Sequence, residues 1–113
     1  MYYLNSGGSW CTSGTVIPLN DSYLNYKYII IRTGWNSQNG GVRDNRLLID
    51  NNTTTLYQVV PIYQATKYIG ALVVEFNSST PNQIKIVQSS GFGTSTVSAN
   101  GIRQIIGEMK NHK

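Results

Sequence analysis

Residues 26–32 are Tyr26-Lys27-Tyr28-Ile29-Ile30-Ile31-Arg32, and this stretch decides the fold of the 113-residue chain. It consists of β-branched and aromatic residues, which fit the pleated surface of a β-strand. Its apolar centre is unbroken, which predicts a strand that is buried on both faces. A chain of this length supports one domain with a modest core, burying roughly two-thirds of its unfolded surface.

Short apolar or alternating segments recur on either side of this stretch, with turn residues between them. Six further strands are predicted, at residues 14–19, 46–50, 56–60, 68–76, 83–87 and 101–109. Pro18 places the first of these at a sheet edge, and Pro61 is expected to end the third. Gly70 is a candidate position for a β-bulge in the fourth.

The last of these segments also fits a short helix, because its apolar residues at 102, 105, 106 and 109 form a stripe at helical spacing. A strand is favoured, since Gly101 and Gly107 bracket only five residues. Seven or eight short strands without a convincing helix predict an all-β fold, an antiparallel β-sandwich of jelly-roll-like type. No linker or internal repeat divides the chain, so one domain is expected.

The charge of the chain does not favour a nucleic-acid partner. The formal net charge is +4, and Lys110 and Lys113 in the C-terminal tail supply two of these charges, which leaves +2 (4 − 2) on the rest. The other cations are scattered singly, whereas nucleic-acid binders gather them on one stripe or helix. No apolar run is long enough to span a membrane, so no membrane insertion is expected.

The residues that usually carry catalysis are few. The only cysteine, Cys11, excludes an internal disulfide and a multi-cysteine zinc site, and the only histidine, His112, is second from the end. Hydrolysis of a polysaccharide needs two carboxylates about 5–10 Å apart, for which Asp44, Asp50 and Glu75 are the candidates. We predict a protein that is not an enzyme and that uses no metal or other cofactor.

The segment from Gly34 to Arg46 holds the residue types that bind sugars. Trp35 would offer a flat apolar face to a sugar ring, and the neighbouring amide, carboxylate and guanidinium groups would meet its hydroxyls. The candidate ligand-binding residues are Trp35, Asn36, Gln38, Asn39, Arg43, Asp44 and Arg46. The alternative for Trp35 is that it folds back to cover the end of the sandwich.

Other interpretations of these and neighbouring residues stay open. Asp44 and Asp50 are candidates for ordinary surface ion pairs with Arg43 or Arg46. Four tyrosines are candidates to join a binding face, namely Tyr2, Tyr3, Tyr57 and Tyr63.

A longer motif surrounds the central strand. Residues 13–31 are Ser13-Gly14-Thr15-Val16-Ile17-Pro18-Leu19-Asn20-Asp21-Ser22-Tyr23-Leu24-Asn25-Tyr26-Lys27-Tyr28-Ile29-Ile30-Ile31, and the chain closes with Ile102-Arg103-Gln104-Ile105-Ile106-Gly107. Asn20, Asp21 and Ser22 suit a turn capped by side-chain oxygens. Tyr23 and Tyr26 are expected to fill the end of the sandwich, with one hydroxyl bonding back to the chain.

These segments resemble the opening and closing strands of the C-terminal domains of bacteriophage tail fibres, tailspikes and baseplate receptor-binding proteins. The resemblance covers residues 13–109 and carries no catalytic signature. It implies a β-sandwich tip domain at 13–109, a strand-poor lead-in from an upstream fibre stem at 1–12 and a basic tail at 110–113.

The resemblance also implies a location and partners. Such domains are usually homotrimers at the tip of a tail fibre or baseplate, on the virion and outside the cell after release. The implied ligand is a host cell-surface polysaccharide or lipopolysaccharide, bound without a covalent step. Two alternatives stay open: a structural domain that trimerises or caps the fibre, and an enzyme that depolymerises the polysaccharide.

Overall fold

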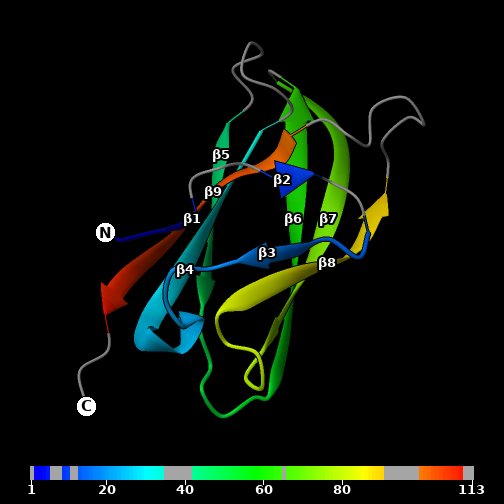
Figure 1. Cartoon of the computed structure of the whole chain (residues 1–113). Coiled ribbons are helices and arrows are strands. Elements are labelled where there is room, and N and C mark those ends of the chain that lie inside the picture. The colour runs from blue at the N-terminus through cyan, green and yellow to red at the C-terminus, as the bar shows by residue number, and fades with distance from the viewer. Residues whose placement is uncertain are drawn as a thin grey trace.

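Two antiparallel β-sheets packed face to face make up the protein, whose computed structural model is drawn in Figure 1. The structure describes residues 2–5, 9–10, 13–34, 42–64, 66–90 and 100–110. Its elements are β1 (Tyr2–Asn5), β2 (Ser9–Trp10), β3 (Val16–Pro18), the 3₁₀ turn η1 (Tyr23–Asn25), β4 (Tyr26–Thr33), β5 (Arg43–Leu48), β6 (Thr55–Gln64), β7 (Lys67–Asn77), β8 (Gln83–Ser90) and β9 (Asn100–Lys110). The predicted all-β antiparallel sandwich is confirmed.

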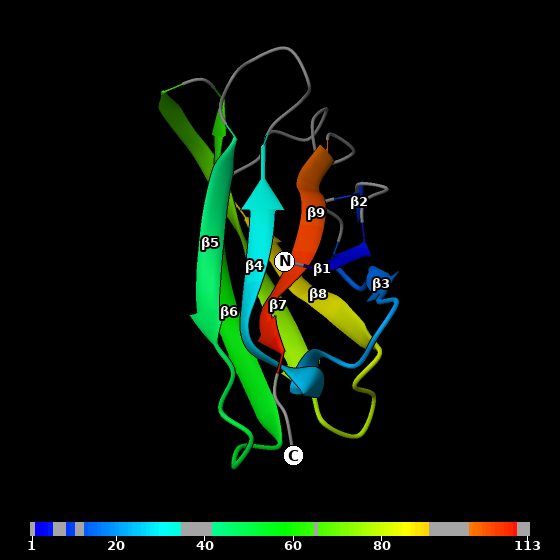
Figure 2. The same cartoon turned by 90° about the vertical axis from the view of Figure 1, so that its left-hand side faces the viewer.

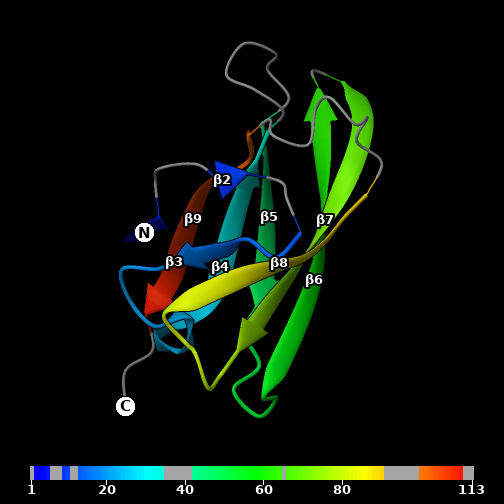
Figure 3. The ribbon, with the colours of Figure 1, turned by 45° about the vertical axis from the view of Figure 1, so that its right-hand side comes forward.

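The chain crosses several times between the two sheets. Sheet A has the strand order β1-β9-β4-β5, with β2 also pairing with β9, and sheet B has the order β3-β8-β7-β6. Figure 2 shows β5, β4 and β9 side by side in front of sheet B, and Figure 3 shows β3 and β8 running at a clear angle to β6. The first and last strands are neighbours, because Tyr2 of β1 pairs with Gly107 of β9.

The central strand of sheet A is β4, which lies between β9 and β5. Ile29, Ile30 and Ile31 are all buried there, so the predicted burial on both faces is confirmed. Successive side chains of a strand point to opposite faces of its sheet. Ile29 and Ile31 therefore enter the core between the sheets, whereas Ile30 lies on the outer face of sheet A beside Ile106 of β9.

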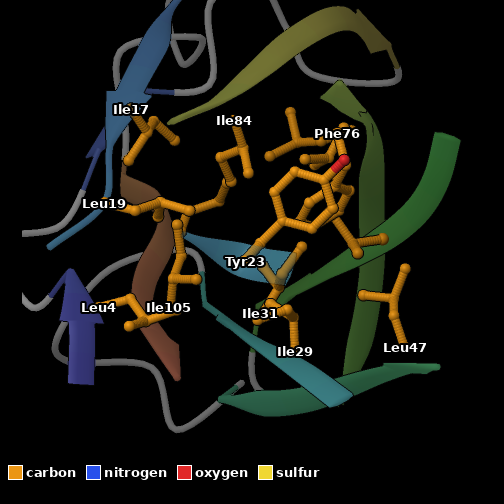
Figure 4. Packing of buried hydrophobic residues seen from close by; sticks show 14 of the residues in the cluster. Leu4, Ile17, Leu19, Tyr23, Ile29, Ile31, Leu47, Phe76, Ile84 and Ile105 are labelled. Carbon is orange, nitrogen blue, oxygen red and sulfur yellow. The ribbon is translucent and has the colours of Figure 1, made fainter. Parts of the chain in front are cut away.

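The core between the sheets consists of aliphatic and aromatic side chains (Figure 4). Sheet A contributes Leu4, Ile29, Ile31, Leu47, Ile102 and Ile105, and sheet B contributes Ile17, Val60, Ile62, Leu72, Val74, Phe76, Ile84 and Ile86. All of these side chains are at most 7% exposed, and burying one large aliphatic group contributes about 1.5–3 kcal/mol. This contact between the inner faces holds the two sheets together.

Side chains hold the turn that leads into β4, as predicted for Asp21 and Ser22. Ser22 Oγ accepts a hydrogen bond from a backbone N–H of η1 at 3.2 Å, and Asp21 Oδ1 accepts one from the N–H of Ser22 at 2.8 Å. The Tyr26 hydroxyl donates to Asp21 Oδ2 at 2.9 Å, which confirms the predicted bond back to the chain. Tyr23 and Tyr26 are both buried, and the Tyr26 ring lies against Gly107.

Two strands lie where none was expected, β1 and the two-residue β2, and both pair with β9. Residues 1–12 were predicted to be strand-poor, yet Tyr2–Asn5 forms β1, which pairs with β9 at the edge of sheet A. Leu4 is 2% exposed and belongs to the core. The prediction failed because a single leucine beside two tyrosines gives too short an apolar pattern, and because the partner strand lies at the other end of the chain.

Prolines and glycines have the positions that the sequence indicates, with one exception. β3 is an edge strand, as Pro18 predicts. β6 runs on through Pro61 to residue 64, so the prediction that this proline ends the strand is wrong. β6 is the other edge of sheet B, where a residue without an N–H is tolerated. The register between β6 and β7 shifts next to Gly70, in line with the predicted bulge.

Two further boundaries concern the strands of sheet A. β5 was predicted at residues 46–50. It begins three residues earlier, at Arg43, and ends two residues earlier, at Leu48. Its first residues are polar on both faces, so they carry no hydrophobic alternation. β9 is a strand over its whole length and not a helix, as predicted, and it pairs with both β1 and β4.

Candidate functional site

The outer face of sheet A carries a cluster of polar and aromatic side chains. Asp44 and Arg46 of β5 both lie on it, because they are two positions apart on one strand. Arg43 lies on the opposite side of the strand, where its guanidinium carbon is 4.8 Å from the centre of the Tyr63 ring of β6. Three residues that are close in sequence are therefore divided between the two faces of sheet A.

The pairing register aligns β5, β4 and β9 in three rows across this face. The rows are Asp44–Arg32–Gln104, Arg46–Ile30–Ile106 and Leu48–Tyr28–Glu108. Tyr3 of β1 pairs with Ile106 and extends the middle row. We call the following residues the polar face of sheet A: Tyr3, Tyr28, Arg32, Asp44, Arg46, Gln104 and Glu108.

Arg32 is the centre of the first row. Its Nε and Nη2 donate to the two carboxylate oxygens of Asp44 at 2.8 and 3.2 Å, and its Nη1 donates to Gln104 Oε1 at 2.5 Å. Tyr3 is near enough to Arg32 to make a small further contribution to raising its pKa. The hydrogen bond to Asp44 is the main cause that raises the pKa of Arg32, so this guanidinium keeps its charge.

Arg46 reaches across β4 to β9. Its Nε and Nη2 lie 2.8 and 2.7 Å from Glu108 Oε1. On the way, its guanidinium carbon lies 3.6 Å from the centre of the Tyr28 ring. A cation over an aromatic face at an exposed site contributes about 0.5–1 kcal/mol. The Arg46 side chain is 52% exposed, so this stack lies at the surface, where a ligand can contact it.

The polar face combines oriented hydrogen-bonding groups with flat apolar surface. Each guanidinium is paired with one carboxylate, so the two positive and two negative charges balance. Guanidinium groups donate to sugar hydroxyls and carboxylates accept from them, while the exposed ring of Tyr3 offers apolar surface to a sugar ring. This arrangement suits a neutral ligand with many hydroxyl groups.

The predicted ligand-binding residues are only partly placed by the structure. Four of them lie outside the described residues: Trp35, Asn36, Gln38 and Asn39. Of the others, Asp44 and Arg46 come together and Arg43 is separated from them. The open alternative of an ion pair between Asp44 and Arg46 is wrong, because the register places Arg32 beside Asp44, and Arg46 pairs with Glu108.

Sequence reasoning did not find Arg32, Gln104 and Glu108. Arg32 is flanked by two buried residues, but Gln104 follows the half-buried Arg103 and Glu108 precedes the exposed Met109, so alternation does not mark all three. Their contacts join residues far apart in the chain, 72 positions for Arg32 with Gln104 and 62 for Arg46 with Glu108. Strand register over such distances is not visible in a single sequence.

The three carboxylates considered for polysaccharide hydrolysis have different surroundings. Asp44 lies on the outer face of sheet A, and Glu75 of β7 lies on the outer face of sheet B, beside Lys85. Asp50 accepts hydrogen bonds from the N–H of Asn52 and from Thr53 Oγ1, which lower its pKa. A general acid needs a raised pKa, so this geometry does not favour hydrolysis by these residues.

Among the described residues, no group of three or more His, Cys, Asp or Glu side chains is arranged to hold a metal ion. In these ranges there is also no helix with the length and apolar character that crossing a membrane requires.

A scan against models of protein families found no match to the chain, and a search of curated proteins found none either. On the polar face of sheet A, hydrogen bonds and a cation–π contact join charged, amide and aromatic side chains of β4, β5 and β9.

Proposed function

We propose that this β-sandwich is the tip domain of a phage tail fibre or a related tail protein, and that it binds a host bacterial surface glycan without a covalent step. The polar face of sheet A is the proposed binding surface. The resemblance of residues 13–31 and 102–107 to phage tail domains supports the tail-fibre part of the proposal. That part includes a homotrimer carried by an upstream stem, located on the virion.

The observation that carries the glycan part is the network joining Arg32, Asp44, Arg46 and Glu108. Ordering long side chains on binding costs about 0.5–1.5 kcal/mol for each one. These four are already held in pairs, so a ligand would meet groups that need little further ordering. A guanidinium also has five N–H donors, more than one carboxylate accepts, which leaves donors for a ligand.

The balance of charge on this face indicates the class of glycan. Arg32 and Arg46 are each neutralised by a carboxylate 2.7–2.8 Å away. An acidic sugar would have to compete with Asp44 or Glu108 for a guanidinium and would be repelled by the displaced carboxylate. We therefore expect neutral hexose or heptose units of a polysaccharide or lipopolysaccharide to bind better than uronic or sialic acids.

The test uses the fluorescently labelled full chain on whole cells of a panel of bacterial strains and on their purified lipopolysaccharide and capsule. Arg46→Ala and Asp44→Asn are expected to weaken binding at least about 10-fold, the loss of roughly one good contact. Lys67→Ala is the matched control, because it removes an exposed cation from the start of β7 in sheet B. Its binding is expected to equal that of the unchanged chain.

Three outcomes would count against parts of the proposal. Polar-face variants that fold and bind like the unchanged chain would show that the site lies elsewhere. A chain that labels no strain and does not block phage attachment would favour the structural cap. Release of shortened polysaccharide chains would favour the enzyme. Trp35→Ala belongs in the same series, and we predict a folded variant with weaker attachment.

A further inference from the structure

Arg103 of β9 lies at an irregularity in the pairing of β9 with β4. Gln104 pairs with Arg32, and Ile102 pairs with the next residue, Thr33. Arg103 is therefore an extra residue that has no partner on β4, as in a β-bulge. A bulge re-aims a side chain, and bulges are frequent next to active sites. The local geometry of β9 thus sets Arg103 apart from the regular rows of the polar face.

The side chain of Arg103 lies on the outer side of sheet A. Thr33 points toward sheet B, where its Oγ1 donates to the Pro61 carbonyl at 3.2 Å, so alternation turns the next position, Gly34, outward. A Cβ added to Gly34 would lie 2.8 Å from Arg103 Cδ and 3.4 Å from Val42 Cγ2. The aliphatic part of Arg103 therefore occupies the space that a side chain at position 34 would need, and it is held beside the first row of the polar face.

The Asp and Glu side chains of the chain do not neutralise Arg103. There are five of them, and three form the ion pairs of the described residues, which are Arg32–Asp44, Arg46–Glu108 and Lys110–Asp21. The other two are Asp50, which accepts hydrogen bonds within its own turn, and Glu75, which pairs with Lys85 in sheet B. Arg103 is half-buried, and a partly desolvated cation is stabilised by an opposite charge. Its guanidinium is therefore available to an anionic ligand group.

The two carboxylates of the polar face are too far from Arg103 to repel such a group strongly. Asp44 lies on β5, two strands from β9 (Figure 2), which corresponds to about 10 Å between the backbones. Glu108 lies five residues further along β9, about 16 Å at the ordinary rise of a strand. Both distances exceed the Debye length of about 8 Å at physiological ionic strength. An anion beside Arg103 is therefore largely screened from both carboxylates, whereas one beside Arg32 or Arg46 is not.

The chemistry of this end of the polar face fits a phosphate ester of a neutral sugar. The planar guanidinium fork donates two parallel hydrogen bonds to a phosphate group. A sugar unit over Arg32 and Arg46 is proposed to be neutral, and a phosphate esterified to it extends away from the ring. The carboxylate of a uronic acid is attached directly to the ring and would stay closer to Asp44 and Glu108.

We infer that Arg103 is an anion subsite of the polar face and that it binds a phosphate group carried by a neutral sugar. The inference rests on the proposed glycan binding and adds the charged substituent that this site selects. Arg32 and Arg46 contact the neutral sugar, and Arg103 distinguishes its phosphorylated form from the unmodified one.

The first test compares one lipopolysaccharide before and after treatment with alkaline phosphatase, which removes phosphate monoesters. The labelled full chain is expected to bind the untreated form at least about 10-fold more tightly, the effect of one charge-assisted contact. Arg103→Gln is expected to bind both forms equally. Lys67→Gln is the matched control, because it removes an exposed positive charge from the start of β7 in sheet B and should keep the preference.

The outcomes separate this inference from the proposed function. Equal binding of both forms by the unchanged chain, or a preference that survives in Arg103→Gln, would overturn the inference and leave glycan binding in place. A chain that binds neither form would contradict the proposed function, and the second test would then decide whether Arg103 binds a phosphate.

The second test titrates the full chain with glucose 6-phosphate, glucose and inorganic phosphate, followed by heteronuclear NMR. Glucose 6-phosphate is expected to shift the Nε–H signal of Arg103 and the backbone N–H signal of Gly34, and glucose is expected to shift them much less. Equal shifts with glucose would overturn the anion subsite. Inorganic phosphate that shifts these signals as strongly as glucose 6-phosphate would overturn the assignment to a sugar phosphate.

The third test changes the position of Arg103 and keeps its charge. Gly34→Ala places a Cβ where the aliphatic part of Arg103 lies, so it is expected to remove most of the preference for the untreated lipopolysaccharide. Circular dichroism and the urea midpoint establish whether the variant is folded. A folded Gly34→Ala chain with an unchanged preference would overturn the placement of the subsite, and Arg103→Gln decides the question if Gly34→Ala does not fold.

Discussion

Arg46 lies over the ring of Tyr28, with its guanidinium carbon 3.6 Å from the centre of the ring. The two residues are on neighbouring strands and are offset by one row of the register, since Arg46 pairs with Ile30 and Tyr28 pairs with Leu48. The guanidinium continues to Glu108 on β9. One side chain therefore connects three strands on the outer face of sheet A, and the proposed binding surface also braces the sheet.

Replacing this guanidinium by an amine separates its geometry from its charge. Arg46→Lys keeps the charge but loses the planar group that stacks on Tyr28 and meets Glu108 through two nitrogens. We expect the free energy of unfolding to fall by less than about 1 kcal/mol, because the pair is half exposed. Urea denaturation at low and high salt measures this. A loss above about 2 kcal/mol would show that the brace is much stronger than exposed ion pairs usually are.

The two buried tyrosines of the opening motif are expected to respond differently to loss of the hydroxyl. The Tyr23 hydroxyl is buried beside Phe76 and has no hydrogen-bond partner among the described residues (Figure 4). Tyr23→Phe should leave the free energy of unfolding unchanged or raise it by up to about 1 kcal/mol. Tyr26→Phe removes the bond to Asp21 and should lower it by about 1–2 kcal/mol. The reverse order in urea denaturation would contradict this assignment.

Gly107 is expected to tolerate no side chain. An added Cβ would lie 2.5–2.7 Å from carbons of the Tyr26 ring, which is buried and bonded to Asp21 and so has little room to move. Gly107→Ala should lower the free energy of unfolding by about 1–3 kcal/mol. The loss should shrink when Tyr26 is also replaced by Ala, because the clash is then gone.

The control for this substitution is Gly14→Ala. Gly14 has open space around it and a φ of +92°, so its cost of about 1 kcal/mol comes from the backbone. That cost should be the same with Tyr26 or Ala at position 26. If both glycine substitutions respond equally to Tyr26→Ala, the contact between Gly107 and Tyr26 is not the cause.

The contact between Asp21 and Tyr26 predicts that the free energy of unfolding falls at both acid and alkaline pH. The Tyr26 hydroxyl, followed by the bonds from Ser22 and Asn25, lowers the pKa of Asp21 below its ordinary 3.8. The stability that Asp21 contributes is therefore present above pH 3.8 and is lost as the pH falls through its folded pKa. Burial and then Asp21 raise the pKa of Tyr26 from 10.0 to about 12. Its contribution is complete below pH 10 and is lost between pH 10 and about 12.

Urea midpoints measured across this range check both signs. In a plot of urea midpoint against pH, Asp21→Asn should reduce the fall at acid pH. Tyr26→Phe should reduce the fall at alkaline pH only in part, because burial also raises the pKa of Tyr23, which therefore contributes to the same fall. A fall at alkaline pH that is unchanged in Tyr26→Phe would remove Tyr26 as its source.

The fold was predictable where a strand contains several apolar or β-branched residues close together in the sequence. Residues 26–32 and 68–76 have long apolar or β-branched runs, and both became central strands of their sheets. Pro61 was wrongly predicted to end its strand. An edge strand tolerates a proline, and whether a strand is at an edge depends on the whole sheet. β1 was missed because it has one buried apolar residue and depends on β9 for its hydrogen bonds.

The site was predictable only in part, for a related reason. The polar residue types between Gly34 and Arg46 predicted a binding segment that includes the start of β5. Asp44 and Arg46 of this segment do lie in a polar cluster. Their partners Arg32 and Glu108 are on β4 and β9, and they are chosen by strand register. The separation of Arg43 follows from simple alternation, which would have been visible had the strand been expected to begin at that residue.

The pairing of Tyr2 with Gly107 has a mechanical consequence. β1 and β9 are antiparallel, and Lys110 Nζ lies 5.4 Å from the centre of the Tyr2 ring, so the two ends of the described chain lie together. Tension applied between these ends would load the hydrogen bonds of β1 one after another, starting at Tyr2. Since β1 has four residues and an irregular register, it would peel away at low force and draw Leu4 out of the core. β9 pairs with β4 over a longer stretch, from Tyr26↔Lys110 to Thr33↔Ile102, so we expect β1 to separate first.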